Sequence, residues 1–92
     1  MKIKVVVGDQ SVGYIAYDKL YFHEDDKWYI RITDLYVDSA WQNKGIGSAL
    51  MTIVLREKCN AFEVVTKQAT DFYERFGFHL ADTPRSIKIN DR

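Results

Sequence analysis

The stretch from Leu35 to Leu50, LYVDSAWQNKGIGSAL, determines the fold expected for this 92-residue chain. Apolar residues lead up to Val37, glycines stand at positions 45 and 47, and apolar residues then recur at three- and four-residue spacing. This order predicts a strand, a glycine-containing loop and an amphipathic helix. Backbone N–H groups of such a loop can converge on one point, and the helix N-terminus adds positive partial charge. We therefore expect a site for a phosphate or pyrophosphate group here.

Further strands are predicted on both sides of this stretch, and a second helix follows it. The predicted strands span Lys2–Val7, Val12–Tyr17, Trp28–Val37, Phe62–Thr66, Phe78–Leu80 and Ser86–Ile89. The first helix is expected from Ile46 to about Lys58, and the second from Ala69 to Phe76, where Gly77 ends it. Leu20–Phe22 either extends the second strand or begins another. This order of elements predicts an α/β or α+β fold, a sheet with two helices.

Composition excludes several classes of protein. Lysine plus arginine and aspartate plus glutamate both number 13, so no net field attracts nucleic acid or an anionic membrane. The single cysteine excludes an internal disulfide and a cysteine-rich zinc site, and we expect no metal. The apolar run Val5–Val7 is too short for a signal peptide. We expect one domain over residues 1–92, soluble and cytoplasmic, with no membrane partner.

The glycine loop can be compared with three known phosphate-binding motifs. A Walker loop needs Gly-Lys-Ser/Thr after four spacer residues, and a dinucleotide fingerprint needs a third glycine where Leu50 stands. By contrast, Gln42-x-x-Gly45-x-Gly47 after a strand ending LYVD resembles the pyrophosphate motif of the GNAT superfamily of acetyl-CoA-dependent N-acetyltransferases. The segment ATDFYERFGF, residues 69–78, is similar to that family's Ala-x-x-Phe-Tyr-x-x-x-Gly-Phe segment. Two such motifs in the right order are more specific than either alone.

The resemblance implies a GNAT-like mixed, mainly antiparallel sheet with two helices, truncated at the N-terminus. Members of the family usually begin with a strand and two helices that form the walls of the acceptor pocket, whereas this chain starts at the next strand. The acceptor site is then either open, which suits a flexible protein lysine, or completed by another chain. The strand Lys2–Val7 is an uncovered edge that invites pairing. We therefore expect a homodimer, and a monomer in light scattering at high micromolar concentration would count against it.

The resemblance also assigns acetyl-CoA as cosubstrate and names its contacts. The backbone of Leu35, Tyr36 and Val37 is expected to face the acetyl and pantetheine groups, with the Val37 N–H polarising the thioester carbonyl. Thr66 aligns with a family asparagine that contacts CoA, and Gln68 is an alternative. Tyr73 matches the tyrosine that protonates the departing thiolate, although a buried core aromatic is the other interpretation. The pyrophosphate is expected on the main chain of Gln42, Asn43, Lys44, Gly45, Ile46, Gly47 and Ser48.

The general base is less clearly indicated. Apolar alternation changes parity between Ile32 and Leu35, which favours a β-bulge near Thr33 and Asp34. Asp34 is the carboxylate of this stretch and the candidate base, but it could equally pair with Arg31 or cap the bulge. His23 and Glu24 are more remote candidates. The resulting hypothesis is an N-acetyltransferase acting on a primary amine, with a protein lysine among the acceptors. The alternative is a reduced GNAT-like module that binds CoA or a partner protein without turnover.

Overall fold

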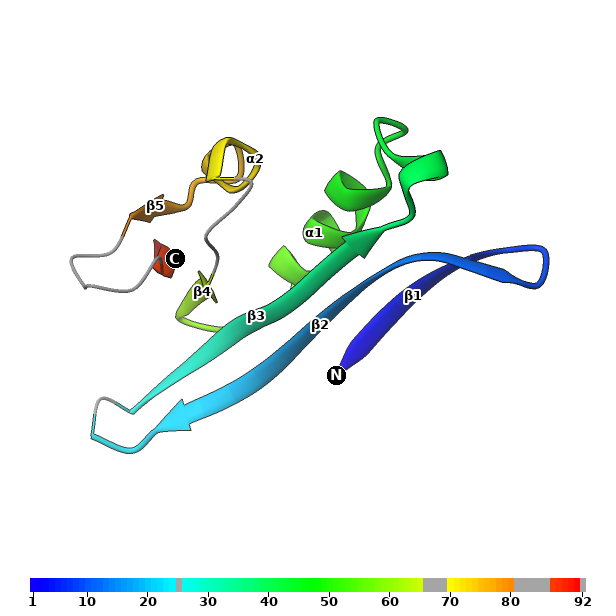
Figure 1. The fold of residues 1–92 in the computed structure, drawn as a ribbon. Helices are drawn as coiled ribbons and strands as arrows, with labels where there is room; N and C mark the ends of the chain where they lie inside the picture. Colours follow the sequence, from blue (N-terminus) through cyan, green and yellow to red (C-terminus); the bar gives the residue numbers. More distant parts are fainter. Residues whose placement is uncertain (25, 66–69, 81–86, 92) are drawn as a thin grey trace. The chain divides into compact units, whose positions relative to one another are not determined.

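A computed structural model describes residues 1–24, 26–65, 70–80 and 87–91, and within them the chain forms β-strands, a 3-10 turn and two α-helices (Figure 1). The strands follow the order β1-β2-β3-β4-β6-β5. β3 and β4 are parallel, whereas β1/β2, β4/β6 and β5/β6 are antiparallel. The predicted mixed, mainly antiparallel sheet with two helices is therefore confirmed. The elements are β1 (Lys2–Val7), β2 (Gln10–Phe22), β3 (Lys27–Val37), a 3-10 turn (Ser39–Trp41), α1 (Ile46–Leu55), β4 (Ala61–Val65), α2 (Thr70–Glu74), β5 (His79–Leu80) and β6 (Ile87–Asp91).

The chain divides into two compact units, each described by itself. The first holds Met1–Tyr17 and Thr33–Lys58, and the second holds Asp18–Ile32 and Cys59–Arg92. β2 and β3 run through both units, because each of these long strands crosses a boundary. The expectation of one domain over residues 1–92 stays a prediction.

The first unit contains the β1–β2 hairpin and α1. Gly8 lies in the left-handed region at φ 62°, which allows the tight reversal between the two strands. β2 continues to Phe22, so Leu20–Phe22 extends this strand and does not begin another. In β1 the register with β2 shifts between Val5 and Val6. The buried side chains of this unit are Val12, Ile15, Tyr17, Leu50, Met51 and Val54.

Helix α1 departs from the prediction at its C-terminus. It ends at Leu55 and not near Lys58. The Arg56 N–H donates to the Ile53 carbonyl at 3.3 Å, and the Glu57 N–H donates to Val54 at 3.0 Å. These i to i−3 bonds tighten the last turn and end the helix. Ile53, which fitted the apolar spacing, is 46% exposed, because the buried stripe runs through Leu50, Met51 and Val54.

The second unit is built on a parallel strand pair. Tyr29–Ile32 of β3 pairs with Ala61–Val64 of β4, and β6 pairs with β4 on its other side. Helix α2 is shorter than predicted, since Phe76 and Gly77 donate to Tyr73 and Glu74 in i to i−3 turns. Gly77, at φ 90°, follows as expected. The buried side chains here are Ile30, Ile32, Ala61, Phe62, Val64, Tyr73 and Phe78.

The change of parity in β3 is confirmed by burial. Ile30 and Ile32 are buried, Thr33 and Asp34 are both exposed, and Leu35 is half-buried. Two successive exposed residues move the inward-facing set by one position. The bulge near Thr33 and Asp34 stays a prediction.

Candidate functional site

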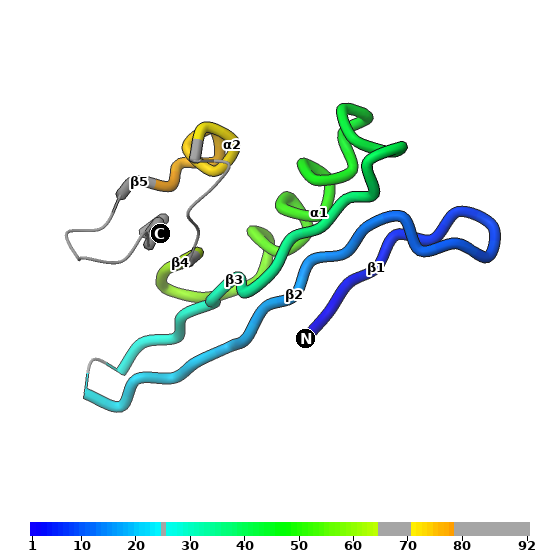
Figure 2. Tube along the Cα trace, in the orientation of Figure 1, coloured from blue at the N-terminus to red at the C-terminus, as the bar shows by residue number. Residues whose placement is uncertain are grey.

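The loop between β3 and α1 is anchored to the neighbouring strand. The chain leaves β3 at Val37, makes the 3-10 turn and returns as α1 (Figure 2). The Asp38 N–H donates to the Val12 carbonyl of β2 at 2.8 Å, and the Trp41 N–H donates to the Asp38 carbonyl at 2.8 Å. The Gln10 side chain also reaches Asp38, with 3.4 Å between Nε2 and Oδ2. The start of the loop is therefore fixed before it reaches the glycines.

Gln42 closes the loop through its side chain. Its Nε2 donates to the Val37 carbonyl oxygen at 3.1 Å, which joins the two ends of the segment between β3 and the glycines. The sequence placed Gln42 among the main-chain pyrophosphate contacts, and the structure adds this side-chain role. The same bond orients the peptide that follows Val37, the residue expected to face the thioester.

Replacing Gln42 with alanine is expected to weaken CoA binding by about twofold to tenfold, the range for one lost hydrogen bond. The loop loses its closing bond, while the helix and sheet keep their own. Calorimetric titration with CoA measures the change. Gln10→Ala is the matched control, because it removes a longer glutamine bond to the same loop at Asp38. Equal affinities for Gln42→Ala and the unsubstituted protein would contradict the closing role.

Two residues of the loop have left-handed backbone conformations. Asn43 lies at φ 63°, and Gly45, the N-cap of α1, lies at φ 85° and ψ 6°. The side chain of asparagine tolerates this region and glycine adopts it freely. A Cβ built on Gly45 would meet nothing within 4 Å, so the space beside it is open. Glycine at this position is thus explained by the backbone conformation, and the opening leaves room for a ligand.

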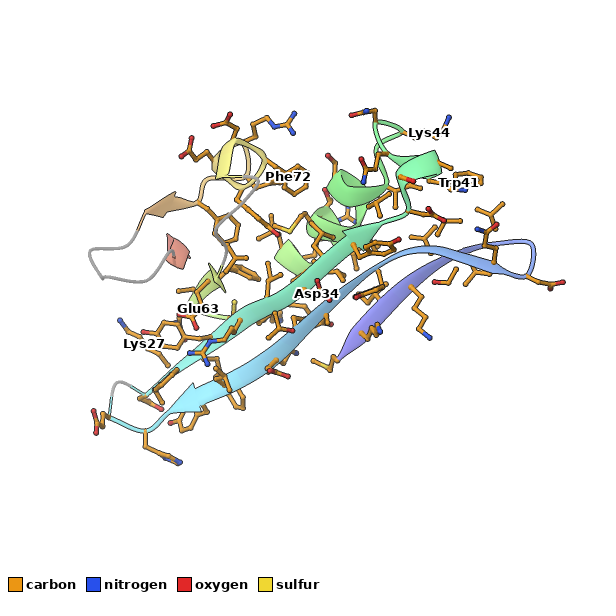
Figure 3. All side chains as sticks on the ribbon, in the orientation of Figure 1. Lys27, Asp34, Trp41, Lys44, Glu63 and Phe72 are labelled. Carbon is orange, nitrogen blue, oxygen red and sulfur yellow. The ribbon has the colours of Figure 1, made fainter. Side chains whose placement is uncertain are left out.

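The first turn of α1 has N–H groups that lack acceptors within the helix. The helix begins with the Ala49 N–H donating to the Gly45 carbonyl at 3.0 Å. The N–H groups of Ile46, Gly47 and Ser48 precede that bond, where a helix has no carbonyl acceptor of its own. Gly45 has no side chain to cap them. Lys44 is exposed next to them, and it lies with Trp41 on the connecting loop (Figure 3). Backbone donors, the helix dipole and an exposed lysine fit a pyrophosphate.

Gly13 is a site residue that the sequence analysis missed. A Cβ at Gly13 would lie 2.9 Å from the Tyr36 carbonyl oxygen, 3.3 Å from Ile46 Cγ2 and 3.5 Å from Val37 Cα. Glycine therefore allows β2 to approach both the end of β3 and the start of α1. The available signal was a glycine inside an alternating strand, which often marks a close backbone approach.

Gly13→Ala is expected to lower the free energy of unfolding by about 1–3 kcal/mol, as overpacking does. It should also shift the amide resonances of Tyr36 and Val37, because the neighbouring backbone must move. Urea denaturation and amide NMR spectra measure the two effects. Gly8→Ala serves as the control. Its new Cβ would meet nothing within 4 Å, so its cost arises only from placing alanine at a φ of +62°. Unmoved Tyr36 and Val37 resonances in a folded Gly13→Ala protein would refute the close contact.

Asp34 has a defined partner on the adjacent strand. Tyr14 Oη donates to Asp34 Oδ2 at 2.6 Å. This hydrogen bond is the main cause that raises the pKa of the Tyr14 phenol above its ordinary value, so the phenol remains the donor at neutral pH. Arg31, considered as the partner of Asp34, forms an ion pair with Glu63 in the second unit. Asp34 is exposed, as a base that meets a substrate must be, and lies on β3 (Figure 3).

Tyr73 lies on α2 in the second unit, and it is 6% exposed. Its ring makes edge contacts with Phe72 and Phe78, with centroids 5.3 and 6.0 Å away. This setting suits a core aromatic and leaves the proposed acid role a prediction. Thr66 and Gln68 lie outside the described residues. His23, a remote candidate for the base, contacts the Tyr21 ring edge-on at 4.8 Å.

Within the described residues, no group of histidine, cysteine, aspartate and glutamate side chains is placed to hold a metal ion. Neither α1 nor α2, the described α-helices, has the length and apolar character needed to cross a membrane.

The fold agrees with comparisons to known proteins. A model of the acetyltransferase (GNAT) domain family matches residues 3–80, and the chain belongs to this family. No curated protein sequence gave a significant match.

Solved structures extend the likeness to nearly the whole chain. The Bacillus subtilis N-acetyltransferase YlbP in complex with coenzyme A has a TM-score of 0.85 and 17% identity, covering 99% of this chain and 67% of that one. Arabidopsis thaliana Naa50, bound to a bisubstrate analogue, has a TM-score of 0.75 and 22% identity, covering 96% and 69%. The Thermoplasma acidophilum PaiA N-acetyltransferase, in complex with coenzyme A, has a TM-score of 0.78 and 17% identity, covering 100% and 60%. At these identities the likeness shows the fold, and this chain spans about two thirds of these proteins.

Proposed function

We propose that this chain is an acetyl-CoA-dependent N-acetyltransferase that transfers an acetyl group to a primary amine, with protein lysines among its acceptors. The observation that carries the proposal is the β3–α1 loop. Left-handed Gly45 at the helix N-cap opens a space beside it, and the first-turn N–H groups of α1 follow. The family assignment adds the cosubstrate whose pyrophosphate this loop fits.

In the proposed reaction, residues 42–48 hold the pyrophosphate through main-chain N–H groups. The cosubstrate supplies a thioester, whose carbonyl carbon forms a bond to the amine nitrogen as the bond to sulfur breaks. The Val37 N–H donates to the thioester carbonyl oxygen and stabilises its developing negative charge. Gln42 supports this geometry, because its bond to the Val37 carbonyl holds the end of β3.

Two further groups move protons in this proposal. Asp34 accepts the proton that the substrate ammonium must lose before its nitrogen attacks the thioester, with Tyr14 fixing one carboxylate oxygen. Tyr73 is the residue that the family resemblance assigns to protonate the thiolate of CoA, and the second proton that the nitrogen loses as the amide forms restores its phenol. A phenol has the protonation state for this role, since it is neutral at pH 7.

A second candidate function is a module that binds CoA or a partner protein without turnover. The burial of Tyr73 between Phe72 and Phe78 favours it, because a purely structural tyrosine has the same surroundings. In that case the loop keeps its ligand while the proton-transfer roles are lost.

Calorimetric titration with acetyl-CoA and with desulfo-CoA tests the proposal. Low-micromolar binding of both is expected, since desulfo-CoA keeps the pyrophosphate and loses only the sulfur. A thiol-release assay with lysine-containing peptides then separates the two functions. Binding with thiol release supports the transferase, and binding without release supports the CoA-binding module. No binding overturns the transferase and leaves only a module that binds a partner protein.

A further inference from the structure

Side chains from three strands of the first unit gather around Tyr14. Tyr14 lies on β2, and its hydroxyl donates to Asp34 of β3 at 2.6 Å. The Tyr36 ring, also on β3, is tilted against the Tyr14 ring with 5.7 Å between centroids. The Nζ of Lys2, on edge strand β1, lies 4.0 Å from the centroid of the Tyr14 ring. We call Tyr14, Asp34 and Tyr36 the aromatic–carboxylate cluster.

The chemistry of the cluster suits an organic cation. The face of a tyrosine ring attracts an ammonium ion through its quadrupole, and a neighbouring carboxylate adds direct charge attraction. The hydrogen bond from Tyr14 leaves the second oxygen of Asp34 able to accept another donor. The cluster is accessible, since Asp34 is exposed and Tyr36 is 50% exposed. Lys2 already places a primary ammonium against the ring.

We propose that the aromatic–carboxylate cluster is a binding site for a primary alkylammonium group, and that Lys2 occupies it as an internal ligand until an external amine displaces it. The ligand class is a flexible chain ending in –NH₃⁺, such as a lysine side chain or an alkyl diamine, because Lys2 has this chemistry.

The position of the cluster places it next to the residues proposed to bind the acetyl group. Asp34 and Tyr36 flank Leu35 and precede Val37, the backbone expected to face the acetyl group. An ammonium held here lies on the strand that presents the thioester carbonyl donor. The identification of the cluster as the acceptor site rests on the proposed transferase function, whereas the ammonium binding itself does not.

An NMR titration of the ¹⁵N-labelled protein with n-butylammonium, without acetyl-CoA, tests the binding. The Tyr14 ring and the Asp34 amide are expected to shift, and n-butanol, a neutral analogue, should leave them unchanged. Lys2→Ala should tighten n-butylammonium binding by about twofold to fivefold, since the internal competitor is gone. Lys4→Ala is the matched control: Lys4 pairs with Tyr14 in the β1–β2 register, so its loss removes the same charge beside the ring and keeps the cation–ring contact of Lys2.

Two variants of the cluster complete the test. Asp34→Asn should weaken n-butylammonium binding by about fivefold, the upper range for an exposed ion pair. Tyr14→Phe keeps the ring and removes the bond to Asp34, so a smaller weakening is expected. Equal affinities for Lys2→Ala and Lys4→Ala, or equal shifts with n-butanol, would overturn the proposal.

These outcomes are independent of turnover. A protein that releases CoA thiol with an amine acceptor but does not bind n-butylammonium at Tyr14 overturns this site and keeps the transferase function. A protein that binds n-butylammonium at Tyr14 but not acetyl-CoA keeps the ammonium site and overturns the function.

Discussion

Gly47→Glu is expected to weaken CoA binding by at least about 100-fold, which corresponds to about 2.7 kcal/mol. The new carboxylate would lie in the first turn of α1, among the N–H groups proposed to hold the pyrophosphate. Two like charges about 4 Å apart near a protein surface repel by about 4 kcal/mol, so the estimate is conservative. The fold should persist, because an acidic side chain in the first turn complements the helix dipole. Calorimetric titration with CoA and a thermal melt measure the two properties.

Thr52→Glu provides the matched control for this charge. Thr52 is exposed on α1, five positions further along the helix and about 7.5 Å along its axis. Its substitution adds the same charge to the same helix, outside the first turn. CoA affinity is expected to change by less than about threefold, because this exposed charge lies outside the first-turn N–H groups and solvent and salt weaken its effect over that distance. Unchanged CoA affinity in a folded Gly47→Glu protein would show that the loop is not the pyrophosphate site.

Tyr73→Phe should lower kcat by about 100-fold while CoA affinity stays the same. General acid catalysis contributes about 10²–10⁴ to a rate, and the substitution removes the hydroxyl group that would supply the proton. The packing should survive, because the contacts of the ring with Phe72 and Phe78 do not involve the hydroxyl. Steady-state kinetics with saturating acetyl-CoA, with calorimetry in parallel, separate the rate from the binding.

Tyr17→Phe controls for the loss of a buried tyrosine hydroxyl. Tyr17 is buried, and its hydroxyl donates to Glu57 at 3.4 Å in the first unit. The change should cost about 1 kcal/mol of stability and leave kcat unaltered. Equal kcat values for Tyr73→Phe and the unsubstituted protein would leave Tyr73 as a core aromatic and favour the non-catalytic module.

Features encoded locally could be predicted from the sequence. The strand before Val37 and the start of α1 at Ile46 follow from apolar periodicity over neighbouring residues. The parity change in β3 is also visible, because Thr33 and Asp34 are two successive polar residues. The ends of the elements were predicted less accurately. Helix α1 ends where Arg56 and Glu57 form i to i−3 hydrogen bonds, and the spacing of apolar residues does not predict such bonds.

Contacts between distant positions were not predictable in the same way. Tyr14 and Asp34 are 20 residues apart, and their bond depends on which strands are neighbours. The close approach at Gly13 likewise requires the positions of Tyr36 and Ile46. Arg31, which sequence proximity offered to Asp34, pairs with Glu63 across the parallel strands β3 and β4. The pairing of the strands therefore determines the partner of Asp34, which its neighbours in the sequence did not identify.

The register shift in β1 has a consequence for self-association. β1 is the first strand in the sheet order, and an edge strand with a regular ladder is a template for another copy of itself. Here the shift between Val5 and Val6 interrupts the ladder, which leaves only Lys2–Val5 before it. An antiparallel pair of copies centred on Ile3 would set Lys2 of one opposite Lys4 of the other, where like charges repel. This register of self-pairing is thus disfavoured by the lysines, so the expected homodimer requires another register or another surface. A strand with acidic residues at the facing positions would meet no such repulsion.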